Sequence, residues 1–160
     1  MTPHETLQSL VGESLVASLA VIDQGEPAVS LVAFAHEWGP LRLHLFVSDL
    51  SAHTPALRAN LRCSLMMHKS PAADDPNSNH ALTRLIVRAD ATFVSRDAAK
   101  ERGVLDRWRA KYAITDMLAG LSDFHFVELV PVEATFVMGF GRAYKCAGAD
   151  LERMEHQGKR

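Results

Sequence analysis

The sequence predicts a predominantly antiparallel β-barrel with inserted helices. Two observations predict this fold class. Short apolar or alternating segments recur along the chain, as expected for strands. The connections between the first of these segments are only a few residues long, whereas parallel βαβ units need crossovers of a dozen residues or more.

The composition is that of one globular domain. The chain has 160 residues, of which 48% are hydrophobic and 22% charged, and its formal net charge is −2. A chain of this length can bury one core without the help of disulfides or bound metals. We assign 1–160 to a single domain, with its core at about 13–143 and a polar tail at 145–160. The balanced charge argues against nucleic-acid binding, which favours a basic excess.

The cysteines and the N-terminus indicate a reducing compartment. Cys63 and Cys146 have no CxxC spacing, which predicts neither a disulfide framework nor a zinc site. The first residues lack the basic and apolar regions of a signal peptide, and no apolar run has the length of a membrane span. We therefore expect a cytoplasmic protein with no membrane attachment.

The first three strands are predicted to form a meander. Residues 14–22 are rich in small and β-branched side chains, and a polar turn around Gly25 follows them. The returning strand at 27–34 has proline at its edge. Residues 41–47 alternate apolar and polar side chains, as a half-buried strand does.

Three helices are expected, and 114–121 is a further candidate for a short helix that ends near Gly120. The first covers 3–10, and the second follows Thr54 and Pro55, an N-cap residue and a proline at the first helical position. The clearest helix is 97–112, which has one apolar face and is weakened only slightly by Gly103.

Four further strands complete the barrel, at 62–68, 82–94, 124–130 and 134–140. Pro131 separates the last two because proline lacks the N–H that a strand ladder needs. The tail is polar and charged, and we expect it to be either a terminal helix or disordered.

Hydroxyl-bearing residues and one histidine follow the third predicted strand: Ser48, Ser51, His53 and Thr54. Hydroxyls, an imidazole and the free N–H groups of a helix N-terminus suit an anion, and phosphate best of all. Ordinary helix capping by serine and threonine explains the same residues equally well.

The eight histidines predict no metal site. The sequence contains no HxH pair, no HExxH motif and no Cys/His finger spacing. His44 and His125 fall at polar positions within strands, where we expect surface histidines or histidines with satisfied hydrogen bonds. No side chain stands out as a catalytic acid, base or nucleophile, so we assign no catalytic residue.

Several segments resemble a known family. Residues 25–32, 45–57 and 60–65 resemble the FMN-binding split barrel of the pyridoxamine 5'-phosphate oxidase-like superfamily. Residues 122–131 and 137–143 are similar to the haem-utilisation branch of that superfamily. The resemblance covers nearly the whole chain. It implies an antiparallel, dimeric split barrel that binds FMN at the interface between its two subunits.

The resemblance also implies six cofactor-binding residues: Ser30, Ser48, Ser51, His53, Thr54 and Arg84. Ser51 and His53 occupy the segment that grips the FMN phosphate in the family. Ser30 stands where the family has an arginine, and Arg84 falls near a position that contacts the edge of the flavin ring. With fewer cations, FMN would bind more weakly, and its binding would depend on the protonation of His53.

Three functions follow from the resemblance. The first is an FMN-dependent oxidoreductase, in which bound flavin accepts a hydride from an unidentified small molecule. The second is haem binding or haem degradation, with His156 of the tail as an axial ligand. The third is a flavin-binding protein without catalysis. The chain has no counterpart of the C-terminal motif with which true pyridoxamine 5'-phosphate oxidases hold their substrate, so that activity is not implied.

We expect an obligate homodimer. A split barrel leaves an apolar face that a second copy must cover, and the candidates to line that face are Val32, Phe34, Met66 and Met67.

Overall fold

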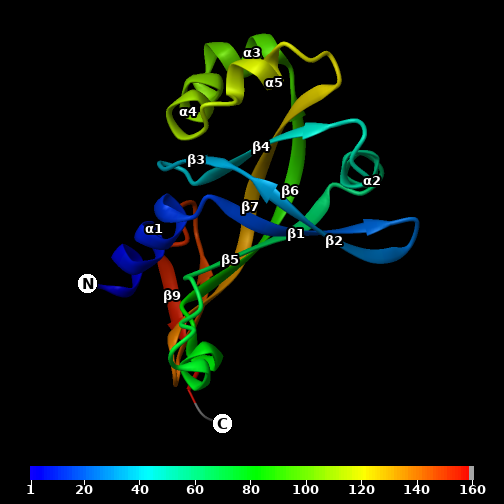
Figure 1. Cartoon of the computed structure of the whole chain (residues 1–160). Helices are drawn as coiled ribbons and strands as arrows, with labels where there is room; N and C mark the ends of the chain where they lie inside the picture. The colour runs from blue at the N-terminus through cyan, green and yellow to red at the C-terminus, as the bar shows by residue number, and fades with distance from the viewer. Residues whose placement is uncertain (159–160) are drawn as a thin grey trace.

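The protein is described here by a computed structural model that covers residues 1–158. All strands of this part of the chain belong to one nine-stranded sheet, and every strand pairing within it is antiparallel. The sheet is strongly bent, and three helices gather at one end of it (Figure 1). The predicted class, an antiparallel β fold with inserted helices, is confirmed.

The strands are β1 (Val16–Asp23), β2 (Glu26–Ala33), β3 (Ala35–Glu37), β4 (Arg42–Ser48), β5 (Arg62–His68), β6 (Arg84–Val94), β7 (Phe124–Gly139), β8 (Arg142–Ala147) and β9 (Arg153–His156). The helices are α1 (Pro3–Glu13), α2 (His53–Ala59), α3 (Arg96–Glu101), α4 (Val104–Lys111) and α5 (Thr115–Ala119), with a 3-10 helix, η1 (Pro76–Ala81).

The strand order differs from the predicted meander. The order is β2-β1-β5-β6-β7-β4-β3, and β8 and β9 extend the sheet from β7. The hairpin of β1 and β2 is as predicted, but β4 pairs with β7 and not with β2. Five successive residues of β4 are buried, so both of its faces need cover. A position between β3 and β7, with helices packed over one face, supplies that cover.

The longest strand, β7, replaces two predicted strands. Pro131 does not end the strand: it lies opposite Ala89 of β6, and the next pair joins Glu133 to Arg88. Val132 is therefore an extra residue without a partner in this ladder. Such a bulge accommodates a proline, because the pairing is already interrupted there.

The predicted tail is neither a helix nor disordered over 145–158, where it forms most of the hairpin of β8 and β9; 159–160 lie outside the described residues. Cys146 and Leu151 are buried, and Met154 packs against the core. Charged residues on the other side, such as Lys145 and Glu155, lie opposite each other across the two strands. Charged residues are typical of edge strands, and here they hide the alternating pattern in the sequence.

Two helices differ from their predictions. The segment 97–112 is divided into α3 and α4 by Gly103, whose φ of 76° is left-handed. The helix α2 begins at His53 with Ala52 as its N-cap, so Thr54 lies inside the first turn and does not cap it. The first helix is capped by Thr2 and Glu5, whose side chains bond to each other's backbone N–H groups.

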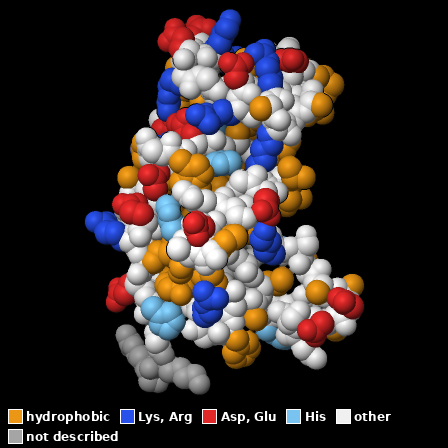
Figure 2. Space-filling view, turned by 90° about the vertical axis from the view of Figure 1, so that its left-hand side faces the viewer, with side chains coloured by type: hydrophobic (Ala, Val, Ile, Leu, Met, Phe, Trp, Pro, Cys, Tyr) orange, Lys and Arg blue, Asp and Glu red, His pale blue; other side chains and the backbone are white. Residues whose placement is uncertain are grey.

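The buried side chains form two clusters on opposite sides of β4 and β7. The barrel cluster includes Leu45 and Val127 and is closed by α1. The helix-side cluster consists of Ala35, Phe46, Phe126 and the buried residues of α3 and α4 that cover them. Phe46 and Phe126 stack with their ring centroids 4.1 Å apart. Charged side chains of both signs gather over α3, α4 and α5 at the top of Figure 2.

Three of the four residues predicted to line a dimer face lie in the core. Val32, Phe34 and Met67 are buried within the single chain, so they cannot cover a partner. Met66 is half-buried and points to the opposite side of β5 from Met67. Among residues 1–158, no helix is long and apolar enough to cross a membrane.

Candidate functional site

The structure brings together three of the six predicted cofactor-binding residues. Ser30 of β2, together with Ser51 and His53 at the start of α2, lines a hollow of about 340 Å³. The Oγ atom of Ser30 lies 2.9 Å from Nδ1 of His53. Two segments that are distant in the sequence thus meet at this hydrogen bond.

The charges around this hollow do not favour a phosphate. Burial lowers the pKa of His53, so its imidazole is mainly neutral at pH 7. The carboxylate residue Asp23 lines the same hollow, and no lysine or arginine does so among the described residues. A phosphate carries nearly two negative charges and binds best to cationic donors. This hollow therefore offers hydroxyl groups but no cation.

Ser48 and Thr54 use their hydroxyl groups within the loop between β4 and α2. Ser48 donates a hydrogen bond to Oδ2 of Asp123 at 2.7 Å and accepts one from the N–H of Leu50. Thr54 is buried and donates to the carbonyl oxygen of Ser48 at 2.6 Å. Both side chains hold this loop in place, which leaves Ser51 and His53 to face the hollow.

Arg84 lies apart from the other five residues within one chain. It opens β6, where its guanidinium donates to the carbonyl oxygens of His80 and Leu82. Ser30 is on β2, separated from β6 by β1 and β5. Three strand spacings amount to roughly 14 Å.

His156 lies in an ordered strand. Its Nε2 atom is 2.9 Å from the carbonyl oxygen of Gly141, and its ring meets Tyr144 edge-on. Because a carbonyl only accepts, Nε2 carries the proton and Nδ1 keeps its lone pair. Histidines that ligate metals usually donate their other ring N–H in this manner. The side chain is exposed and is therefore accessible to a ligand.

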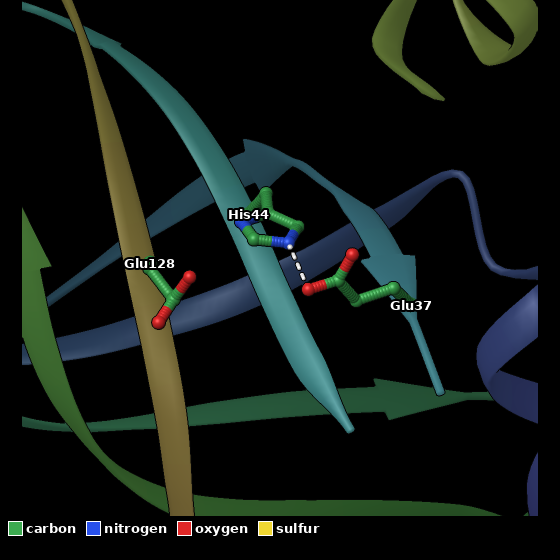
Figure 3. Close-up of side chains that lie close together, drawn as sticks. All are labelled: Glu37, His44 and Glu128. Atoms are coloured by element: carbon green, nitrogen blue, oxygen red, sulfur yellow. Dashed lines mark ion pairs between the residues drawn. The ribbon is translucent and has the colours of Figure 1, made fainter. Parts of the chain in front are cut away.

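A second group of polar residues lies on the neighbouring strands β3, β4 and β7 (Figure 3). His44 of β4 is directly opposite Glu128 of β7, and Glu37 projects from β3 on the other side. The Nε2 atom of His44 is 3.5 Å from Oε1 of Glu37. We name these three residues the Glu–His–Glu cluster. His44 differs from its prediction: it is only 2% exposed, and Nε2 has no hydrogen-bond partner within residues 1–158.

Arginines surround the two carboxylates of the cluster. Arg107 of α4 pairs with Oε2 of Glu37 at 3.3 Å, and Arg102, at the end of α3, bonds to Oε2 of Glu128. Arg42 lies 3.6 Å from Oε1 of Glu128. Burial is the main cause of a lowered pKa for His44, which is therefore neutral near pH 7. In the sequence, the only sign of this cluster is a set of polar residues within apolar strands.

Comparisons with known proteins identify relatives of the whole chain. No family model matches it. The haem oxygenase HutZ of Vibrio cholerae is 31% identical over 146 residues, which cover 90% of this chain and 81% of the relative. The chloroplastic haem oxygenase HOZ of Arabidopsis thaliana is 29% identical over 163 residues, covering 98% of this chain. The chain spans 46% of the length of HOZ.

The solved structures that resemble this chain include that of HutZ itself. The crystal structure of HutZ, described as the haem storage protein of Vibrio cholerae, has a TM-score of 0.71 at 26% identity and covers 82% of this chain and 91% of its own. A pyridoxamine 5'-phosphate oxidase-like protein from Listeria innocua shares the fold, with a TM-score of 0.61 at 14% identity over 86% of this chain and 100% of its own. From its fold and its likeness to HutZ, this chain belongs to the haem-utilisation branch of the pyridoxamine 5'-phosphate oxidase-like split-barrel superfamily.

Proposed function

We propose that this protein binds haem and degrades it as a substrate. The observation that carries the proposal is the 31% identity to haem oxygenase HutZ, which extends over 90% of the chain. A likeness of this extent includes most of the helices and strands and is not confined to one shared motif. We therefore prefer haem degradation to the function of an FMN-dependent oxidoreductase, which the family resemblance first suggested.

The hollow at Ser30 and His53 supports the preference for haem over FMN. An FMN phosphate would meet a neutral imidazole and the carboxylate of Asp23, with no cation lining the hollow. Both features weaken the binding of a doubly charged anion.

A wider hollow supports haem. Its volume is about 620 Å³, within the range of roughly 300–1,000 Å³ that is common for ligand sites. Arg88, Lys145 and Arg153 line it, together with Glu133, which pairs with Arg88, and Glu155. The cationic groups of Lys145 and Arg153 suit the two propionates of haem. Met154 of β9 lines it as well, whereas the side chain of His156, opposite Tyr144, leaves the other face of the strand from that of Glu155. We propose that haem occupies this side of the sheet.

The test is a titration of the cofactor-free protein with haemin, followed by turnover. We expect a saturable Soret band, which disappears when ascorbate is added in air while ferrous iron is released to a chelator. A parallel titration with FMN, followed by flavin fluorescence, is expected to show much weaker binding. Tight FMN binding together with no saturable Soret band would overturn the proposal and restore the flavin interpretation.

A further inference from the structure

We propose that the Glu–His–Glu cluster binds a divalent ion of a first-row transition metal. Glu37, His44 and Glu128 are separate from the hollow proposed for haem. They combine three converging ligand atoms, an unpartnered buried nitrogen and two oriented carboxylates.

Three adjacent strands bring the ligands together. His44 and Glu128 are cross-strand partners, so their side chains leave the same face of the sheet. Glu37 reaches the imidazole from β3, the strand on the other side of β4 from β7 (Figure 3). One ligand atom from each residue lies within 4.8 Å of the other two.

The imidazole of His44 has a nitrogen without a partner. The residue is 2% exposed, and Nε2 makes no hydrogen bond to any described residue although it points toward Glu37. A buried polar atom in this situation is destabilising unless a water or an ion satisfies it. A metal ion is a suitable partner, because the neutral imidazole presents a lone pair.

Each carboxylate divides its two oxygen atoms between different partners. Oε2 of Glu37 faces Arg107, and Oε2 of Glu128 accepts a hydrogen bond from Arg102. The Oε1 atoms are left with contacts longer than hydrogen bonds, to His44 at 3.5 Å and to Arg42 at 3.6 Å. Carboxylates that ligate metals are commonly held by such outer hydrogen bonds. The arginines thus orient the carboxylates and leave Oε1 of each without a hydrogen bond, although Arg42 stays within ion-pair distance of Oε1 of Glu128.

The donor set selects the class of ion. Two carboxylates and one imidazole suit Mn²⁺, Fe²⁺ or Zn²⁺, whereas Cu⁺ prefers sulfur ligands and Ca²⁺ takes six to eight oxygen atoms. The two carboxylates face three arginines, so the ion would enter a cluster whose charges are already balanced by Arg42, Arg102 and Arg107. Arg102 and Arg107 are almost half exposed and Arg42 is 24% exposed, so water screens their repulsion of the ion, least at Arg42. Water molecules would complete the coordination.

The test uses Mn²⁺ as the probe, because free Mn²⁺ gives a six-line electron paramagnetic resonance signal that is lost on binding. The full chain without haem is titrated, and we expect one bound ion per chain. Glu37→Gln, which removes the charge at constant size, is expected to weaken binding at least about tenfold, equivalent to 1.4 kcal/mol. The matched control is Asp49→Asn, which alters the other histidine–carboxylate pair, Asp49 with His125, and should leave binding unchanged.

A second variant separates a loss of ligation from a loss of fold. Glu37→Asp keeps the charge but retracts the carboxylate by one methylene, so it should also weaken Mn²⁺ binding while circular dichroism stays unchanged. Wild-type protein that binds no Mn²⁺ would overturn the proposal, as would equal binding by both Glu37 variants and the wild type. Because haem is absent from this experiment, its outcome is independent of the function proposed above.

Discussion

Lys111 is a half-buried cation at the end of α4. Its Nζ atom donates to the carbonyl oxygen of Phe34 at 2.8 Å and lies 4.0 Å from the centroid of the Phe34 ring. Burial lowers the pKa of Lys111 to about 8. In the unfolded chain a lysine titrates near 10.4, so between these values the unfolded state binds a proton that the folded state does not. The free energy of unfolding therefore increases with pH in this window.

Replacement of Lys111 by methionine tests this linkage. Lys111→Met removes the cost of the buried charge, so its stability relative to wild type should be greatest near pH 7 and should decline as the pH approaches about 10. The lost hydrogen bond to Phe34 adds an offset that does not vary with pH. Urea unfolding across this range measures the trend, and the exposed Lys100 of α3 provides the control, Lys100→Met. A constant difference between Lys111→Met and wild type would contradict the prediction.

His156 is the residue that the family resemblance suggests as an axial ligand of haem. Since its Nε2 is bonded to Gly141, the residue is held in place before haem arrives. We expect His156→Ala to shift the Soret band and to weaken haem binding at least about tenfold. His80→Ala, which alters another exposed histidine, is the control. Truncation of the C-terminus is less informative, because removing 154–160 also removes β9. Identical spectra for both variants and the wild type would exclude His156 as the ligand.

Gly103 determines where one helical segment becomes two. It has a φ of 76°, and a Cβ added there would meet no atom within 4 Å, so a substitution is opposed by the backbone alone. Gly103→Ala is expected to destabilise the protein by about 1–2 kcal/mol. Gly12→Ala is the matched variant: Gly12 is in α1, also with free space around it, and alanine should stabilise the helix by about 0.5–1 kcal/mol. Thermal unfolding of both variants should show shifts of opposite sign.

Elements defined by local signals are those that the sequence predicts well. The hairpin of β1 and β2 has alternating strands and a turn in which Gln24 and Gly25 both have positive φ. The break at Gly103 is harder to foresee, because one glycine within an apolar helical pattern is usually tolerated. The hairpin of β8 and β9 is hidden by its charged outer residues. Pro131 is misleading in the opposite sense, because a bulge absorbs it.

The candidate sites depend on contacts between distant segments. The sequence identifies Ser51 and His53 as polar neighbours, but only the pairing of β4 with β7 places His44 beside Glu128. The predicted meander separates these two strands, so it cannot reveal the Glu–His–Glu cluster. The hydroxyls of Ser48 and Thr54 are likewise ambiguous in the sequence. Ser48 is engaged by Asp123, which precedes β7, whereas Thr54 donates to the carbonyl oxygen of Ser48 within the same loop.

A second copy of the chain would cover an exposed face of the sheet. Cross-strand pairing places Leu31, Ser18, Met66 and Ile86 in one row across β2, β1, β5 and β6. Leu31 is 68% exposed, Val29 on the same strand is 72% exposed, and Ile86 is 39% exposed. Exposed apolar side chains grouped on one face of a sheet commonly mark an interface. We propose a homodimer through this row.

Sedimentation of a charged variant tests the dimer. Wild type is expected to sediment as a dimer at micromolar concentration, and Leu31→Glu as a monomer, because burying an unpaired carboxylate at the interface is unfavourable. Met117→Glu adds the same charge at a residue of α5 that is 60% exposed and outside this row, so it should remain dimeric. A monomeric wild type, or a dimeric Leu31→Glu, would contradict the proposal.

The long strand β7 has a consequence for how the molecule opens. Phe126 faces the helix-side cluster, whereas Val127 and Leu129 face the barrel cluster. One edge of β7 is occupied by β6, and the other first by β4 and then by β8. Detaching β7 would expose both clusters at once, so neither half can unfold while the other stays intact. Amide hydrogens at the centre of β7 should therefore exchange with solvent deuterium only through global unfolding, and later than those of β9 at the edge.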